Sequence, residues 1–269
     1  MIIRDIIEKY RYFSFISYFR GKNYITIKKG AELKITRTTK LQHCQIFIAK
    51  GSSLKIGEGG KLTNVSICIM EAGTHIEIGE NCTLTNCSIE PYKANVKIGN
   101  GNFVQTPIDS FPVRFRIHNA DLAIGDYNSL SCGIWARFGG KLTIGSRNVI
   151  NQRTEIRCDE RVEIGDYNQI SYDCVIWDTN THVIHPAMER RQIVEKEYPC
   201  FGLETERPKT KPIKIGDDCW IGRGCSLLKG VQLGDRCIVA YNTTLPGGSY
   251  SSGNTLMNDV NVKARPNNV

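Results

Sequence analysis

Short runs of alternating apolar and polar residues recur along the chain, and many end in the same motif: an aliphatic residue, any residue, Ile or Leu, then Gly. The motif ends at Gly57, Gly79, Gly99, Gly125, Gly145, Gly165, Gly216 and Gly234. Successive glycines lie 18 to 26 residues apart, except for a step of 51 residues between Gly165 and Gly216. A period of this size is typical of a solenoid, whose turns bury their apolar faces against one another. The long step predicts an insertion.

The alternation predicts short strands separated by tight corners. Gly, Asn and Asp stand between the runs, as in Gly125-Asp126-Tyr127-Asn128, and these residue types tolerate the left-handed backbone of a corner. A period of ~20 residues with two or three strands leaves no room for a helix. We therefore predict an all-β parallel solenoid over residues 23–250, with roughly ten coils stacked to about 50 Å. A protruding loop is expected at 183–211, and a C-terminal tail at 251–269.

Residues 1–22 have a different pattern. Ile2, Ile3, Ile6, Ile7 and Tyr10 recur at helical spacing with charged residues between them. This segment is expected to be a helix that caps the open end of the solenoid. A basic amphipathic helix resting on the inner membrane is the alternative.

Composition narrows the class of protein. The 269 residues are 41% hydrophobic and contain no apolar run near the ~20 residues of a membrane-spanning helix. The N-terminus lacks the features of a secretory signal. Eleven cysteines without a CxxC pair suggest buried, reduced thiols and a cytoplasmic protein. The net charge of +8 favours anionic partners, but no nucleic-acid-binding motif is present and nucleic acid is not expected.

The last coils show a six-residue repeat directly, with Ile215-Gly216-Asp217-Asp218-Cys219-Trp220 followed by Ile221-Gly222-Arg223-Gly224-Cys225-Ser226. Residues 213–240 resemble the C-terminal coils of the hexapeptide-repeat acyltransferases. The resemblance covers about residues 30–245 and implies a left-handed parallel β-helix, a homotrimer and acetyl transfer from acetyl-CoA. The runs 178–182 and 220–222, on either side of the insertion, are similar to the maltose, galactoside, streptogramin and capsular-sugar O-acetyltransferase branch.

By this resemblance His182 is the general base. A sugar hydroxyl must lose its proton as it attacks a thioester, and an imidazole with a pKa near ~6.5 suits that task at neutral pH. Asp178 is the expected partner that fixes the tautomer of His182, although a backbone carbonyl could serve instead. A lone loop histidine is otherwise often an exposed, idle side chain. His185 is a possible acceptor contact.

The resemblance also places CoA and acceptor contacts. Trp220 is expected beside the active site, although a corner Trp can equally pack against a neighbouring subunit. The implied CoA contacts are Gly222, Gly224, Ala240, Lys263 and Arg265. Turn geometry explains the two glycines equally well, and Lys263 and Arg265 could belong to a solvated tail. The sequence after Ala240 departs from the family pattern.

Acceptor contacts are expected one coil before the insertion and at its start. The candidates are Asn151, Arg153, Asn180 and His185. An Arg at position 153 would suit a carboxylate-bearing sugar. The insertion carries both charge signs, so it is expected to be solvated and to pack on a neighbouring subunit.

The expected function is an acetyl-CoA-dependent O-acetyltransferase that modifies a bacterial surface glycan, either capsule or lipopolysaccharide, without a metal. N-acetylation of an amino-sugar nucleotide is the near alternative. A zinc hydratase similar to γ-carbonic anhydrase is disfavoured, because the sequence offers one close histidine pair, His182 and His185, three residues apart. A non-catalytic β-helix scaffold is a further alternative.

Overall fold

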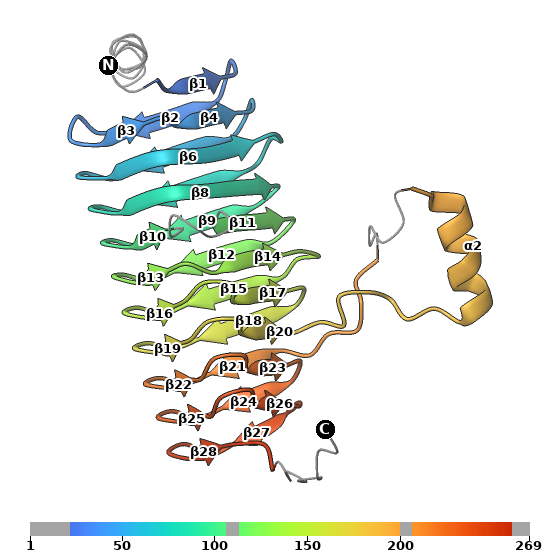
Figure 1. The fold of residues 1–269 in the computed structure, drawn as a ribbon. Helices are drawn as coiled ribbons and strands as arrows, with labels where there is room; N and C mark the ends of the chain where they lie inside the picture. Colours follow the sequence, from blue (N-terminus) through green and yellow to red (C-terminus); the bar gives the residue numbers. More distant parts are fainter. Residues whose placement is uncertain (1–21, 106–112, 200–205, 260–269) are drawn as a thin grey trace, which may run out of the picture.

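The structure is a computed structural model that describes residues 22–105, 113–199 and 206–259 (Figure 1). Nearly all of the predicted N-terminal helical segment, together with Lys263 and Arg265, lies outside these residues. Within the described ranges, no helix has the length and apolar character needed to cross a membrane.

The chain winds into a parallel β-solenoid whose coils stack from the N-terminal to the C-terminal end (Figure 1). Each coil contributes strands to three faces in a fixed order, and each strand pairs in parallel with its equivalent in the next coil. The first face is a ten-stranded sheet, which agrees with the predicted number of coils. The predicted all-β fold is confirmed, and the stacking is consistent with a left-handed β-helix.

The three faces are defined here by their strands. The first face contains β2 (Glu32–Ile35), β5 (Ser53–Ile56), β7 (His75–Ile78), β9 (Asn95–Ile98), β12 (Asp121–Ile124), β15 (Lys141–Ile144), β18 (Arg161–Ile164), β21 (Ile213–Ile215), β24 (Val231–Leu233) and β27 (Gly248–Tyr250). The second face contains β3 (Lys40–Gln42), β10 (Phe103–Gln105), β13 (Ser129–Leu130), β16 (Val149–Ile150), β19 (Gln169–Ile170), β22 (Trp220–Ile221), β25 (Ile238–Val239) and β28 (Thr255–Leu256). The third face contains β1 (Tyr24–Ile27), β4 (Gln45–Ile48), β11 (Val113–His118), β14 (Gly133–Ala136), β17 (Glu155–Cys158), β20 (Val175–Trp177), β23 (Ser226–Leu228) and β26 (Thr244–Leu245). The long strands β6 (Lys61–Ile69) and β8 (Thr83–Tyr92) cross from the second face to the third.

The core is a column of stacked aliphatic side chains inside the prism. The register places Ile56 against Ile78 and Ile144 against Ile164, and all four are buried. Each such side chain contributes roughly 1.5–3 kcal/mol through burial. The alternation seen in the sequence therefore separates this core from the solvated outer surface.

The edge between the first and second faces is held by a ladder of buried asparagines. The side-chain oxygen of Asn128 accepts the Asn148 backbone N–H at 2.8 Å, and Asn148 accepts that of Asn168 in the same way. Cys219 continues the ladder by donating its N–H to Asn168. The ten cysteines that the structure describes are free, and nine of them are buried, as predicted. Cys68, which was also expected to fill the interior, is only half-buried.

The insertion leaves the third face after β20 and returns to the first face at β21 (Figure 1). It contains α2 (Ala187–Glu197), which has no buried residue and projects from the solenoid. The sequence predicted a solvated loop here rather than a helix, because charged residues surround α2 and leave no apolar stripe for periodicity to detect. At the other end of the chain, strand pairing continues to Leu256, beyond the predicted boundary at residue 250.

Candidate functional site

At the edge between the third and first faces, where the insertion begins, two charged side chains form a buried ion pair. The guanidinium of Arg137 donates to both oxygens of Asp159, at 3.0 and 2.8 Å. The Asp159 side chain is fully buried and that of Arg137 is 12% exposed. Sequence reasoning missed this pair. Its signal is a pair of opposite charges 22 residues apart, which is about one coil.

Asp178 holds the turn of the preceding coil. Its carboxylate accepts backbone N–H groups from Asp159, Glu160 and Arg161, each at 2.8 Å. Burial raises the pKa of Asp178, although the three N–H donors act in the opposite direction. The side chain thus joins two coils, and its predicted role in fixing the tautomer of His182 stays a prediction.

Thr179 and Thr181 connect the buried ion pair to His182. The Thr179 hydroxyl donates to Asp159 Oδ2 at 2.7 Å and accepts the Thr181 N–H at 3.0 Å. Arg137 Nη2 donates to the Thr181 carbonyl oxygen at 3.3 Å. His182 follows directly and is exposed. An exposed imidazole on an anchored segment can exchange a proton with a bound hydroxyl.

The two ends of the insertion are tied together beside this segment. Thr179 and Thr210 form an isolated antiparallel bridge, and the Lys211 N–H donates to the Asp178 carbonyl oxygen at 2.9 Å. Asn180 donates its N–H to the Lys209 carbonyl at 3.0 Å, and its side-chain oxygen accepts from Lys229 Nζ. Lys229 was not singled out from the sequence. Asn180 is therefore engaged within the chain, and an acceptor contact there stays a prediction.

His185 lies two residues before the first residue of α2. Its Nδ1 is 3.0 Å from Glu189 Oε1, one helical turn later, and the histidine side chain is 27% exposed. This pairing anchors the first turn of the helix. A contact between His185 and the acceptor stays a prediction.

Trp220, predicted beside the active site, and the predicted CoA residues that the structure describes lie elsewhere on the solenoid. Trp220 lies on β22 of the second face, between Gln169 and Ile238 in register, and is 57% exposed. Gly222, Gly224 and Ala240 lie at the edge between the second and third faces. Within one chain, these residues lie on the second face and at its edge with the third face, whereas His182 lies at the edge between the third and first faces.

The geometry of the coils accounts for both glycines. A Cβ on Gly222 would lie 2.9 Å from the backbone N of Tyr241 and from the Val239 carbonyl oxygen. Gly224 has φ +73°, a left-handed conformation that glycine adopts without penalty. The turn-geometry interpretation therefore has direct support, whereas CoA binding at these glycines stays a prediction.

The predicted acceptor residues Asn151 and Arg153 lie at the same edge, two coils earlier. The Asn151 side chain donates to the Ile170 carbonyl oxygen at 3.2 Å. Arg153 pairs with Asp173 at 2.5 Å, and Asp173 also accepts from Arg223 at 2.8 Å. These exposed pairs lower the pKa of Asp173, chiefly through Arg153. Arg153 is therefore already partnered by a carboxylate of its own chain.

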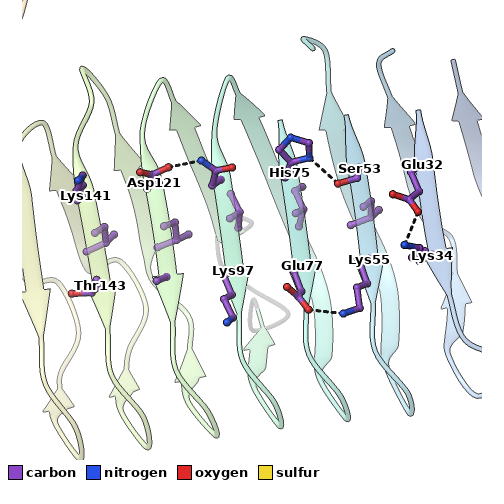
Figure 2. A pocket seen from close by; sticks show the side chains of 17 residues that line it. Glu32, Lys34, Ser53, Lys55, His75, Glu77, Lys97, Asp121, Lys141 and Thr143 are labelled. Carbon is purple, nitrogen blue, oxygen red and sulfur yellow. Dashed lines mark hydrogen bonds and ion pairs between the residues drawn. The ribbon is translucent and has the colours of Figure 1, made fainter. Parts of the chain in front are cut away.

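Two surface depressions lie away from the residues that the sequence predicted for the site. One, of about 570 Å³, lies on the first face (Figure 2). Its polar side chains pair with one another, as in Lys55–Glu77 at 2.7 Å and Ser53–His75 at 2.9 Å. The other, of about 820 Å³, adjoins the third face and includes Arg137, Tyr92 and His118. No predicted site residue lines either depression. No group of three His, Cys, Asp or Glu side chains suited to a metal occurs among the described residues.

The C-terminal coils match a known family model. Residues 212–247 match the model described as bacterial transferase hexapeptide (six repeats). This match agrees with the resemblance that the hexads indicated.

A curated relative matches part of the chain. The probable acetyltransferase Rv3034c of Mycobacterium tuberculosis (strain ATCC 25618 / H37Rv) is 27% identical over 127 residues, which are 46% of this chain and 35% of that protein. The chain thus matches about a third of the length of this relative.

Two solved structures also resemble the chain. The polySia-specific acetyltransferase NeuO is 16% identical with a TM-score of 0.48, covering 92% of this chain and 91% of its own. The polysialic acid O-acetyltransferase OatWY is 17% identical with a TM-score of 0.33, covering 88% and 84%. At these scores neither likeness defines the acceptor of this chain.

Proposed function

We propose that the protein is an acetyl-CoA-dependent O-acetyltransferase that modifies a sugar hydroxyl, with His182 as general base. The observation that carries this proposal is the position of His182, an exposed imidazole on an anchored segment. The same insertion leads into coils that match the bacterial transferase hexapeptide model. The name of the mycobacterial relative, a probable acetyltransferase, supports acetyl as the transferred group.

In the proposed reaction, the sugar hydroxyl oxygen attacks the thioester carbonyl of acetyl-CoA. Its proton passes to His182 as the new carbon–oxygen bond forms. The carbon–sulfur bond then breaks, and the proton reaches the departing sulfur, so that the products are the acetyl ester and CoA with a free thiol. His182 ends in its starting protonation state.

The proposed active site lies between copies of the chain. His182 belongs to the edge between the third and first faces, whereas Trp220 and Gly222 belong to the second face and its far edge. A closed homotrimer would bring one copy's His182 to another copy's Trp220. The insertion, whose helix buries no side chain within its own chain, is the expected contact.

The proposed acceptor is a bacterial surface glycan that carries carboxylates, with Arg153 as a contact. The Arg153–Asp173–Arg223 cluster supports this proposal, because two guanidinium groups share one carboxylate and leave a net positive charge at that edge. N-acetylation of an amino sugar is the second candidate, since the same base can serve an amine.

The test is mass spectrometry of glycans after incubation with acetyl-CoA. Sialic-acid, uronic-acid, neutral and amino-sugar oligosaccharides form the panel, and the His182→Ala variant is compared with the wild-type protein. We expect a gain of one acetyl mass on an acidic glycan that disappears in the variant. His75→Ala, an exposed histidine on the first face, serves as the control. Wild-type turnover by His182→Ala would exclude His182 as base, and no gain on any glycan would favour the scaffold alternative.

A further inference from the structure

We propose that Arg137, Asp159 and Thr179 are positioning residues that hold the Thr181 backbone in a left-handed conformation and thereby aim the imidazole of His182. The inference rests on the proposed role of His182 as base. None of the three side chains is assigned a contact with substrate. They act through the peptide groups on either side of Thr181.

The backbone at Thr181 is unusual. Its φ is +65°, and among the described non-glycine residues with positive φ it is the one β-branched side chain. The other positions of this kind hold Asn, Asp, Lys, Arg, His, Tyr or Phe, none of which is branched at Cβ. Left-handed backbone is unfavourable for an L-residue, and branching at Cβ makes it less favourable still. Such a conformation persists where surrounding contacts impose it.

Two hydrogen bonds hold the peptide groups on either side of Thr181. Its N–H donates to Thr179 Oγ1 at 3.0 Å, and its carbonyl oxygen accepts from Arg137 Nη2 at 3.3 Å. The second of these peptide groups is the one that joins Thr181 to His182. Fixing it sets the direction in which the His182 side chain leaves the backbone.

Asp159 in turn holds Arg137 and Thr179 in place. Asp159 is fully buried and accepts two hydrogen bonds from Arg137 and one from Thr179. Because the Thr179 hydroxyl donates its hydrogen to Asp159, the lone pairs of the hydroxyl oxygen can accept a hydrogen bond from the Thr181 N–H. The Arg137 guanidinium also lies over the rings of Trp135 and Phe138, at 4.8 and 4.9 Å from their centroids. In a buried network each bond strengthens its neighbours, so the chain of contacts acts as one rigid unit.

The first test removes the Thr179 hydroxyl without changing side-chain shape. In Thr179→Val, we expect kcat to fall by about 10- to 100-fold through misplacement of the base. The KM for acetyl-CoA should stay within about twofold, because a positioning residue acts on the chemical step. Hydrogen–deuterium exchange at the Thr181 amide should become faster. Thr179→Ser, which restores the hydroxyl, should recover kcat.

The matched control is Thr39→Val, the same substitution at a buried threonine whose hydroxyl donates to the Gly57 carbonyl at 3.0 Å, far along the chain from His182. It should leave kcat unchanged. If Thr179→Val does not fold, Arg137→Lys is the second variant. It keeps a cation beside Asp159 but loses the donor to the Thr181 carbonyl. In this variant kcat should also fall while the KM for acetyl-CoA changes little.

The outcomes separate this inference from the proposed function. An inactive His182→Ala combined with wild-type kcat in folded Thr179→Val or Arg137→Lys would overturn the positioning role and leave the base intact. Full activity in His182→Ala would remove the proposed function instead. Unchanged exchange at the Thr181 amide in folded Thr179→Val would also contradict the inference, and that measurement needs no acceptor.

Discussion

At the scale of single residues, buried polar side chains join one coil to the next. Asn128 and Asn148 do so at one edge of the prism, and Asp178 does so at the edge that carries the insertion. In each case a side-chain oxygen accepts backbone N–H groups that the corner leaves without a strand partner. Asp178, which is predicted to be catalytic, is therefore also needed to join its coil to the preceding one.

Asp178 allows this requirement to be measured. In Asp178→Ala, three buried or half-buried N–H groups lose their acceptor, and we expect the free energy of unfolding to fall by about 2–3 kcal/mol. Chemical denaturation followed by circular dichroism measures the change. Asp121→Ala, which removes an exposed carboxylate from the first face, is the control and should change stability little. An equal free energy of unfolding in both variants would contradict the role of Asp178 in holding the turn of the preceding coil.

The cysteines yield a second prediction at this scale. Burial raises the pKa of Cys87 and Cys132 to about 12, so both are protonated thiols at pH 8 and titrate only at far higher pH. Cys68 is the half-buried thiol among the described cysteines. Iodoacetamide at pH 8, with peptide mapping, should label Cys68 before any other described cysteine. Faster labelling of Cys87 or Cys132 would show that the coils open.

At the scale of elements, the insertion divides into an anchored base and a projecting helix. The base is tied to the solenoid at Asp178, Thr179 and Thr210, whereas α2 buries no side chain. Ile184, Met188 and Tyr198 are at least two-thirds exposed on this arm. Large exposed apolar side chains indicate a surface that another molecule covers.

Deleting the arm tests that division. Replacing residues 184–206 by a short Gly-Ser link removes α2 but keeps the base and His182. We expect the β-sheet circular dichroism spectrum to be unchanged, because no core residue is lost. We expect sedimentation to shift from a trimer toward smaller species, because the arm is the proposed contact between copies. An intact trimer would show that the arm is not needed for assembly.

At the scale of the whole molecule, the three faces separate residues that the sequence analysis assigned to one site. His182 lies at the edge between the third and first faces, whereas Trp220 lies on the second face. We therefore expect the proposed site to take these two residues from different copies of the chain.

Mixed oligomers test this dependence. His182→Ala and Trp220→Ala, each expected to be inactive as a pure trimer, are co-expressed with different affinity tags and purified through both. If each site takes its His182 and Trp220 from different copies, about a third of the sites in the doubly tagged trimers carry both residues, because each such trimer has one intact junction out of three. Transfer activity should return to about that fraction of the wild-type rate. Persistent inactivity of the doubly tagged trimers would place both residues' functions within one copy.

The fold was predictable because each coil repeats its own local pattern. The glycine period specified the number of coils, and the one long step marked an insertion, which was predicted at 183–211 and lies between Trp177 and Ile213. α2 escaped prediction because it has no apolar stripe, and strand β28 because Thr255–Leu256 is too short to show a period. His182 was found through its neighbours in the motif, whereas Arg137 and Asp159 were not, since neither lies in a motif.

The sequence by itself determined the solenoid, its inward-facing aliphatic column and the place where the chain leaves it, because these follow from residues close together in one coil. The tertiary structure alone decided which coils' side chains meet. Stacking brought Arg137 to Asp159, 22 residues away, and Thr179 to Asp159, 20 residues away. It also directed the carboxylate of Asp178 into a turn and set Trp220 on the second face, away from the edge that carries His182. These pairings depend on how each corner folds and which face follows it, and the local alternation of apolar and polar residues does not encode that.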